Sequence, residues 1–301
     1  NPEQVRALTA RLQAEAEIPL FVAVDQEGGR VRRLREEAGF PFSPSAKAMG
    51  QRTPDETRQE GERTGQLLAG LGINLDFAPV ADVDVNPTSP AIGALERSFS
   101  ADPEAVAAHA LAFSRGLRSR GVLPCLKHFP GHGSAMADSH LGLTDISRTW
   151  SPAELIPYER LIPLEASPLI MCGHLFLERF DADHPATLSP AVLTGLLRER
   201  LGFAGVIVSD DMQMRAVTAH YGLEEAVLRA VEAGVDILVF GNNLDYDPDI
   251  VPKAVDILVR GVDSGRLSRQ RIETSFERIR KAKALLAAPS GAARESTGGR
   301  S

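Results

Sequence analysis

The chain of 301 residues carries 33 lysines and arginines against 40 aspartates and glutamates, which gives a formal net charge of −7 and a pI near 5.6. A nucleic-acid-binding protein normally presents a basic face, so this balance disfavours nucleic acid as a partner. The sequence lacks a run of about 18 apolar residues, the length that a membrane-spanning helix needs, and we expect a soluble protein without a membrane partner.

Five segments share the pattern of a helix start, in which a small capping side chain is followed by proline. The five capping residues are Asn1, Thr53, Asp102, Ser151 and Ser189. Apolar residues then recur at helical spacing, for example at Val106, Ala110, Phe113 and Leu117. We therefore expect helices to begin at all five positions, and a last helix to begin at Ser268. Because a helix start stands at Asn1 itself, we also expect further sequence to precede it.

Short apolar segments separate these helices, and their continuous character is typical of strands in a parallel sheet that helices cover on both faces. The six candidate strands are 18–24, 73–80, 121–126, 168–172, 205–208 and 235–240. The two cysteines, Cys125 and Cys172, lie inside two of these segments. This placement favours buried free thiols over a disulfide framework, so a reducing, cytoplasmic location is expected.

Polar side chains follow the C-terminal ends of most candidate strands, as at Asp25, Asp82, Lys127, His174 and Asp210. Such a collection predicts closure into a TIM-type (β/α)8 barrel, where every strand end reaches one central pocket. An open doubly wound sheet is the alternative. Its dinucleotide-binding form is disfavoured, because G-x-G-x-x-G does not open a helix after any candidate strand.

Six strands are too few for this barrel, and we expect its first strand to be missing from the chain. The predicted architecture is a single barrel domain over residues 1–288. The segment 289–301 is small and polar, and it is expected to form a disordered tail.

The loop 127–140 holds three of the seven histidines together with a carboxylate. Asp138 and His140 are separated by one residue, so both side chains point the same way in an extended loop. A carboxylate that accepts a hydrogen bond from one imidazole nitrogen raises the basicity of the other, which would make His140 a proton donor or acceptor near neutral pH. The alternative is a loop histidine tied to an acid for structural reasons.

Asp210 ends a candidate strand and is followed by a second acid, Asp211. One of two adjacent acids at a strand end normally points into the pocket, while the other turns toward the following helix. Paired with a proton donor across a barrel mouth, Asp210 is a candidate nucleophile. A helix cap is the alternative for the same residue.

His128 and His132 are four residues apart, which raises a metal-dependent hydrolase as an alternative. Pro130 and the glycines around it prevent the helix on which that spacing would bind zinc, so we expect no metal.

After the first candidate strand, Asp25 can accept hydrogen bonds from adjacent sugar hydroxyls, and two glycines allow a tight turn that returns an arginine to the pocket. A charged surface loop is the alternative there.

Six motifs, taken together and in this order, resemble glycoside hydrolase family 3. They are V-D-Q-E-G-G-R-V (24–31), A-P-V-A-D-V (78–83), R-S-F (97–99), K-H-F-P-G-H-G (127–133), D-S-H (138–140) and S-D-D-M (209–212). More narrowly, they are similar to the bacterial β-N-acetylglucosaminidases of peptidoglycan recycling.

The resemblance implies a TIM-type barrel and a retaining, two-step reaction without a metal or organic cofactor. Asp210 matches the family's nucleophile, and His140 matches its acid/base, oriented by Asp138. The positions that match those binding N-acetylglucosamine in the first subsite are Asp25, Arg33, Arg97, Lys127 and His128.

The function implied is that of a monomeric, cytoplasmic exo-β-N-acetylglucosaminidase that releases N-acetylglucosamine from peptidoglycan-derived muropeptides. Two alternatives stay open. One is a family 3 glycosidase or phosphorylase of broader sugar specificity, and the other is a barrel that binds sugar without catalysis.

Overall fold

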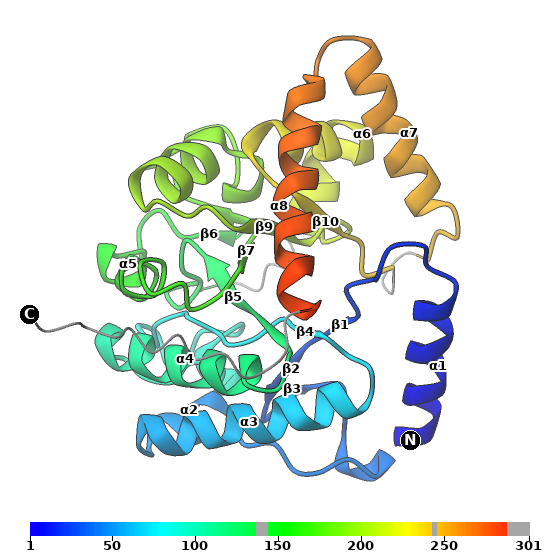
Figure 1. Ribbon diagram of the computed structural model, residues 1–301. Coiled ribbons are helices and arrows are strands. Elements are labelled where there is room, and N and C mark those ends of the chain that lie inside the picture. The colour runs from blue at the N-terminus through cyan, green and yellow to red at the C-terminus, as the bar shows by residue number, and fades with distance from the viewer. Residues whose placement is uncertain (137–143, 243–245, 288–301) are drawn as a thin grey trace, which may run out of the picture.

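The computed structural model describes residues 1–136, 144–242 and 246–287 (Figure 1). A strand lies in each of the six predicted segments, and all six belong to one sheet. The strands are β1 (Ala23–Val24), β4 (Leu75–Asp76), β5 (Leu123–Phe129), β7 (Leu169–Cys172), β9 (Val206–Asp211) and β10 (Ile237–Val239). The predicted tail, 289–301, lies outside the described residues.

The order of the strands across the sheet is β1-β4-β5-β7-β9-β10, which is also their order along the chain. Every neighbouring pair is parallel. In a doubly wound sheet the strand order reverses at a point within the sheet. The strand order here does not reverse, so the doubly wound alternative is excluded. Within the described ranges β1 and β10 are the two edges of the sheet. The fold is therefore a TIM-like half-barrel, and eight-stranded closure stays a prediction.

The five predicted helix starts are confirmed. Asn1 and Thr53 form capping boxes at the start of α1 (Pro2–Ala14) and α3 (Pro54–Gly70), and Asp102 caps α4 (Pro103–Arg118). Ser151 precedes a 3₁₀ turn, η3 (Pro152–Leu155), that runs directly into α5 (Ile156–Leu161). The Ser189 hydroxyl accepts a hydrogen bond from the Val192 amide at the start of η5 (Ala191–Arg200).

The remaining elements connect or cover the sheet. The helices are α2 (Ala46–Gly50), α6 (Arg215–Ala233), α7 (Ile250–Asp263) and α8 (Arg269–Ala287), and the short turns are η1 (Glu36–Ala38), η2 (Gly93–Leu95) and η4 (Ala186–Leu188). An antiparallel hairpin joins β2 (Gln26–Gly28) to β3 (Val31–Arg32), and β6 (Thr144–Asp145) pairs in parallel with β8 (Leu175–Phe176). Among the described helices, none is both long and apolar enough to cross a membrane.

Helices cover both faces of the sheet. On one face, Ile170 and Ile207 belong to the main core, together with Phe113 of α4. On the other face, Met171 and Val208 pack in a second cluster that includes Ala282 of α8, which crosses in front of the strands in Figure 1. Each such buried aliphatic side chain contributes about 1.5–3 kcal/mol relative to exposure, so α8 is an integral part of the fold. Cys125 and Cys172 are free and buried, as predicted.

Candidate active site

The C-terminal ends of the strands surround a cavity of about 300 Å³. Its lining includes every predicted site residue within the described part of the chain, namely Asp25, Arg33, Arg97, Lys127, His128 and Asp210. Parallel strands of one sheet end at the same edge, which brings residues 185 positions apart in the chain into one pocket. The other two predicted residues, Asp138 and His140, lie outside the described residues.

The hairpin after β1 carries Arg33 back to the pocket, as the two glycines predicted. Gly28 and Gly29 have positive φ angles of 95° and 57°. A Cβ atom on Gly28 would lie 2.0 Å from the carbonyl oxygen of Pro44, so a side chain cannot be accommodated there. The turn places Nη2 of Arg33 3.1 Å from Oδ2 of Asp25.

Lys127 joins two carboxylates at the base of the pocket. Its side chain is 2 % exposed, and Nζ lies 2.8 Å from Oδ1 of Asp25 and 2.6 Å from Oε1 of Glu27. Burial alone would lower the pKa of Lys127, but the two carboxylates outweigh burial and hold that pKa above its ordinary value. Burial likewise raises the pKa of Asp25, while Lys127 and then Arg33 bring it below its ordinary value. All of these groups are therefore charged at neutral pH.

Arg97 and Glu27 form a bidentate pair beside Lys127. Nε and Nη2 of Arg97 donate to the two oxygens of Glu27 at 2.8 and 2.7 Å, and Nη1 donates to the carbonyl of Ala91 at 2.9 Å. Burial would raise the pKa of Glu27, but Arg97 and Lys127 outweigh burial and hold it far below its ordinary value. Glu27 was not among the predicted site residues, although it stands two positions after Asp25 in the same motif.

Asp82 orients His128. Oδ2 of Asp82 lies 2.7 Å from Nδ1 of His128, and Oδ1 accepts from the amides of His128 and His132 at 3.1 and 2.8 Å. The buried carboxylate can only accept, so Nδ1 carries the proton and Nε2 accepts from Nη2 of Arg97 at 3.2 Å. Asp82 is the second site residue missing from the prediction; its strand-end motif was the signal.

The arrangement around His128 disfavours the metal-dependent alternative. Both of its ring nitrogens contact protein partners. His132 is 3 % exposed, and burial, followed by the nearby His128, lowers its pKa to about 4, so it is neutral at pH 7. Within the described residues, no group of three or more histidine, cysteine, aspartate or glutamate side chains is placed to hold a metal ion.

Asp210 presents a partly buried carboxylate to the cavity. Its Oδ1 accepts from the amide of Asp211 at 2.8 Å. Burial raises its pKa, but His128 and His174 outweigh burial and the net pKa is lowered, so the carboxylate is ionised at neutral pH. Oδ1 of Asp211 instead accepts from the amides of Gln213 and Gly241. Both acids line the cavity, and Asp211 rather than Asp210 accepts from amides beyond the strand. The assignment of Asp210 as nucleophile stays a prediction.

The pocket thus combines groups that can bind a polyhydroxylated ligand with a separate carboxylate that can act as a nucleophile. Asp25 and Lys127 offer an acceptor and donors side by side, which suits vicinal hydroxyl groups. Asp210 reaches the same cavity from the opposite part of the sheet and forms no ion pair within the described residues. An ionised carboxylate in this position can attack an electrophilic carbon of a bound sugar.

Comparison with known proteins agrees with this geometry. Residues 3–282 match the Glycosyl hydrolase family 3 N terminal domain. The β-hexosaminidase LpqI of Mycobacterium tuberculosis is 39 % identical over 275 residues, which are 87 % of this chain and 67 % of LpqI. The β-hexosaminidase of Tolumonas auensis is 40 % identical over 247 residues, which are 80 % of this chain and 72 % of that protein.

A solved structure shares the fold over almost the whole chain. The family 3 β-N-acetylglucosaminidase from Paenibacillus sp. str. FPU-7 superposes with a TM-score of 0.88 at 36 % identity, covering 99 % of this chain and 57 % of that one. The present chain therefore spans little more than half of that protein and about two thirds of LpqI. The match in sequence and fold establishes that the chain belongs to glycosyl hydrolase family 3, and its enzyme class is that of a glycoside hydrolase.

Proposed function

We propose that the chain is a retaining exo-β-N-acetylglucosaminidase that releases N-acetylglucosamine from peptidoglycan-derived muropeptides. The observation that carries the proposal is the meeting of ionised Asp210 with the Asp25–Lys127–Glu27 network in one cavity. Relatives named β-hexosaminidase and β-N-acetylglucosaminidase support the choice of sugar.

In the first step of the proposed reaction, a carboxylate oxygen of Asp210 attacks the anomeric carbon and the glycosidic bond breaks. The departing oxygen takes a proton from His140, which Asp138 orients. In the second step His140 removes a proton from water, the water oxygen attacks the anomeric carbon, and the bond to Asp210 breaks. Two inversions give net retention. An imidazole in place of the usual second carboxylate can perform both proton transfers near neutral pH.

The first subsite binds the sugar through groups that are already held in place. Asp25 accepts hydrogen bonds from adjacent hydroxyls, while Lys127 and Arg33 donate to sugar oxygens. Arg97 and His128 complete the wall, and Glu27 and Asp82 fix their orientation. This network needs little rearrangement on binding, which favours catalysis. The cavity, at about 300 Å³, is at the small end for ligand sites, as suits an enzyme that removes one terminal sugar.

The test compares hydrolysis of 4-nitrophenyl N-acetyl-β-D-glucosaminide with that of the matching β-glucoside, using the parent protein and Asp210→Asn. Asp211→Asn is the matched control, because it changes the neighbouring acid. Selective cleavage that Asp210→Asn abolishes and Asp211→Asn largely retains supports the proposal. Comparable rates on both sugars favour the broader glycosidase, and phosphate-dependent turnover favours the phosphorylase. Sugar binding without cleavage favours the non-catalytic barrel.

The muropeptide substrate has its own test. A disaccharide of N-acetylglucosamine linked β-1,4 to anhydro-N-acetylmuramic acid is expected to be cleaved, and no release of N-acetylglucosamine would contradict this part of the proposal.

We further propose a cytoplasmic location, which the buried free thiols of Cys125 and Cys172 support. The monomeric state stays a prediction, and size-exclusion chromatography with light scattering tests it.

A further inference from the structure

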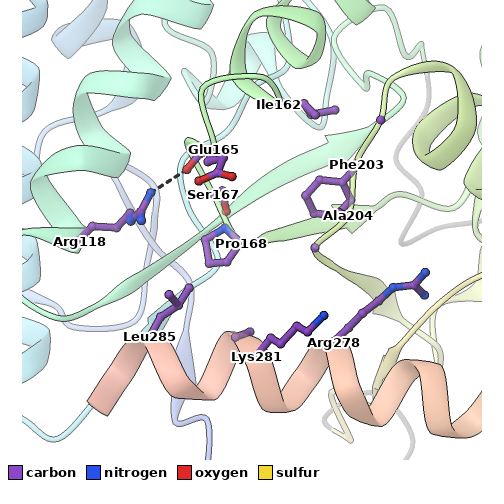
Figure 2. A pocket seen from close by; sticks show the side chains of 13 residues that line it. Arg118, Ile162, Glu165, Ser167, Pro168, Phe203, Ala204, Arg278, Lys281 and Leu285 are labelled. Atoms are coloured by element: carbon purple, nitrogen blue, oxygen red, sulfur yellow. Dashed lines mark hydrogen bonds between the residues drawn. The ribbon is translucent and has the colours of Figure 1, made fainter. Parts of the chain in front are cut away.

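We propose that a second cavity binds the phosphate group of a small molecule (Figure 2). It lies at the N-terminal ends of the strands, whereas the candidate active site lies at their C-terminal ends. The cavity measures about 320 Å³. It lies against Ser167 and Pro168, which lead into β7, and against Ala204 and Gly205, which lead into β9. The candidate active site lies at the other end of these strands, so the two sites are separate and this inference does not depend on the proposed function.

The lining of this cavity is basic on a chain that is acidic overall. Arg118, Arg278 and Lys281 line it, against a single acid, Glu165. Nη1 of Arg118 donates to the backbone carbonyl of Glu165 at 2.7 Å, and no ion pair joins the two side chains. In the described part of the chain, no carboxylate oxygen lies within 4 Å of the Lys281 ammonium group. Figure 2 shows Arg278 and Lys281 on the side of α8 that borders the cavity.

A charge imbalance behind the cavity strengthens this basic character. The carboxylate of Asp236 is fully buried and contacts three guanidinium groups, those of Arg198 at 2.6 Å, Arg271 at 3.3 Å and Arg278 at 3.2 Å. One negative charge therefore faces three positive ones. Burial lowers the pKa of Arg198 to about 10, and Arg278 and Arg271 add to this lowering by repulsion. An anion on the cavity side of Arg278 would offset the surplus.

The chemistry of the lining points to phosphate. Guanidinium and ammonium donors on one wall are the groups that bind phosphate oxygens through charge-assisted hydrogen bonds. Apolar groups, including Phe203 and Leu285, form other parts of the wall. Gly205 allows the Phe203 ring to lie there, since a Cβ atom would approach its Cζ to 2.6 Å. The mixture suits a small phosphoester whose organic part contacts this wall, and inorganic phosphate shares its anionic chemistry.

The test is calorimetric titration of the whole chain at low ionic strength with inorganic phosphate, adenosine monophosphate and adenosine. Lys281→Gln is the main variant, because Lys281 has no ion pair in the described residues whose loss would disturb folding. Arg280→Gln is the matched control on the same helix, since Arg280 pairs with Glu277 and does not line the cavity. Thermal unfolding and glycoside hydrolysis are expected to be unchanged in both variants.

The expected result is saturable binding of one anion per chain, weakened about tenfold by Lys281→Gln and unchanged by Arg280→Gln. Tighter binding of adenosine monophosphate than of phosphate assigns the site to a phosphoester, and equal binding assigns it to the free ion. Adenosine alone is expected not to bind. Absence of saturable binding to the parent protein, or equal weakening by Lys281→Gln and Arg280→Gln, would overturn the proposal.

Discussion

Replacing Asp76 with asparagine is expected to stabilise the protein at neutral pH. The carboxyl group lies within β4 and is fully buried. Its Oδ1 accepts from the amide of Gln26 at 3.0 Å, whereas Oδ2 is buried without a hydrogen-bond partner. Burial raises the pKa of Asp76 from 3.8 to about 7. Asparagine retains the acceptor for Gln26 and cannot ionise.

The pKa difference sets the size and the sign of the effect. The folded chain holds the Asp76 proton more tightly than the unfolded chain, so this contribution to stability is complete below the ordinary pKa and is lost as the pH rises to about 7. The full loss corresponds to about 4 kcal/mol in the free energy of unfolding. Asp76→Asn should therefore match the parent near pH 4 and exceed its stability by up to about 4 kcal/mol above pH 7.

Urea unfolding of the parent and Asp76→Asn across this pH range measures the difference. Asp55→Asn is the control, because Asp55 is exposed on the first turn of α3. Its difference from the parent should be small at every pH. A difference for Asp76→Asn that does not grow between pH 4 and 7, or a variant less stable than the parent above pH 7, would show that the folded chain does not hold the Asp76 proton more tightly than the unfolded chain.

Two further substitutions test the pocket network. Lys127→Met leaves the buried carboxylate of Glu27 and the partly exposed carboxylate of Asp25 together without their shared cation. The protein should then lose about 3–5 kcal/mol in urea unfolding. A loss no larger than that of exposed Lys47→Met would contradict this role of Lys127. Asp82→Asn presents an amide donor to Nδ1–H of His128, and kcat/KM for the N-acetylglucosaminide should fall about 10–100-fold. Unchanged kinetics would show that the tautomer of His128 does not matter.

Much of the fold could be predicted from local signals. Proline after a capping side chain identified five helix starts, because these residues satisfy or replace the first amides of a helix. Continuous apolar segments identified the six strands. Their order across the sheet could not be predicted, since hydrogen bonds between strands depend on tertiary packing. Only the observed order separates the half-barrel from a doubly wound sheet.

Part of the site could also be predicted from local signals, namely the polar residues at the ends of the candidate strands. Asp25, Lys127 and Asp210 stand at strand ends, where the direction of a parallel sheet places side chains in one pocket. Glu27 and Asp82 stand in strand-end motifs, but their roles could not be predicted, because they act by holding Arg97 and His128, partners 70 and 46 positions away in the chain. The arginines around Asp236 are equally invisible in sequence, since η5 and α8 meet only in the folded chain.

We propose Asp210 as the nucleophile of a retaining reaction, and trapping the covalent intermediate would identify the residue that carries the sugar. A fluorinated β-N-acetylglucosaminide with a good leaving group should react quickly in the first step and slowly in the second. Mass spectrometry of the intact protein and its peptides should then show one sugar attached to Asp210, and none in Asp210→Asn. Attachment at another residue, or turnover without any covalent sugar, would contradict the account.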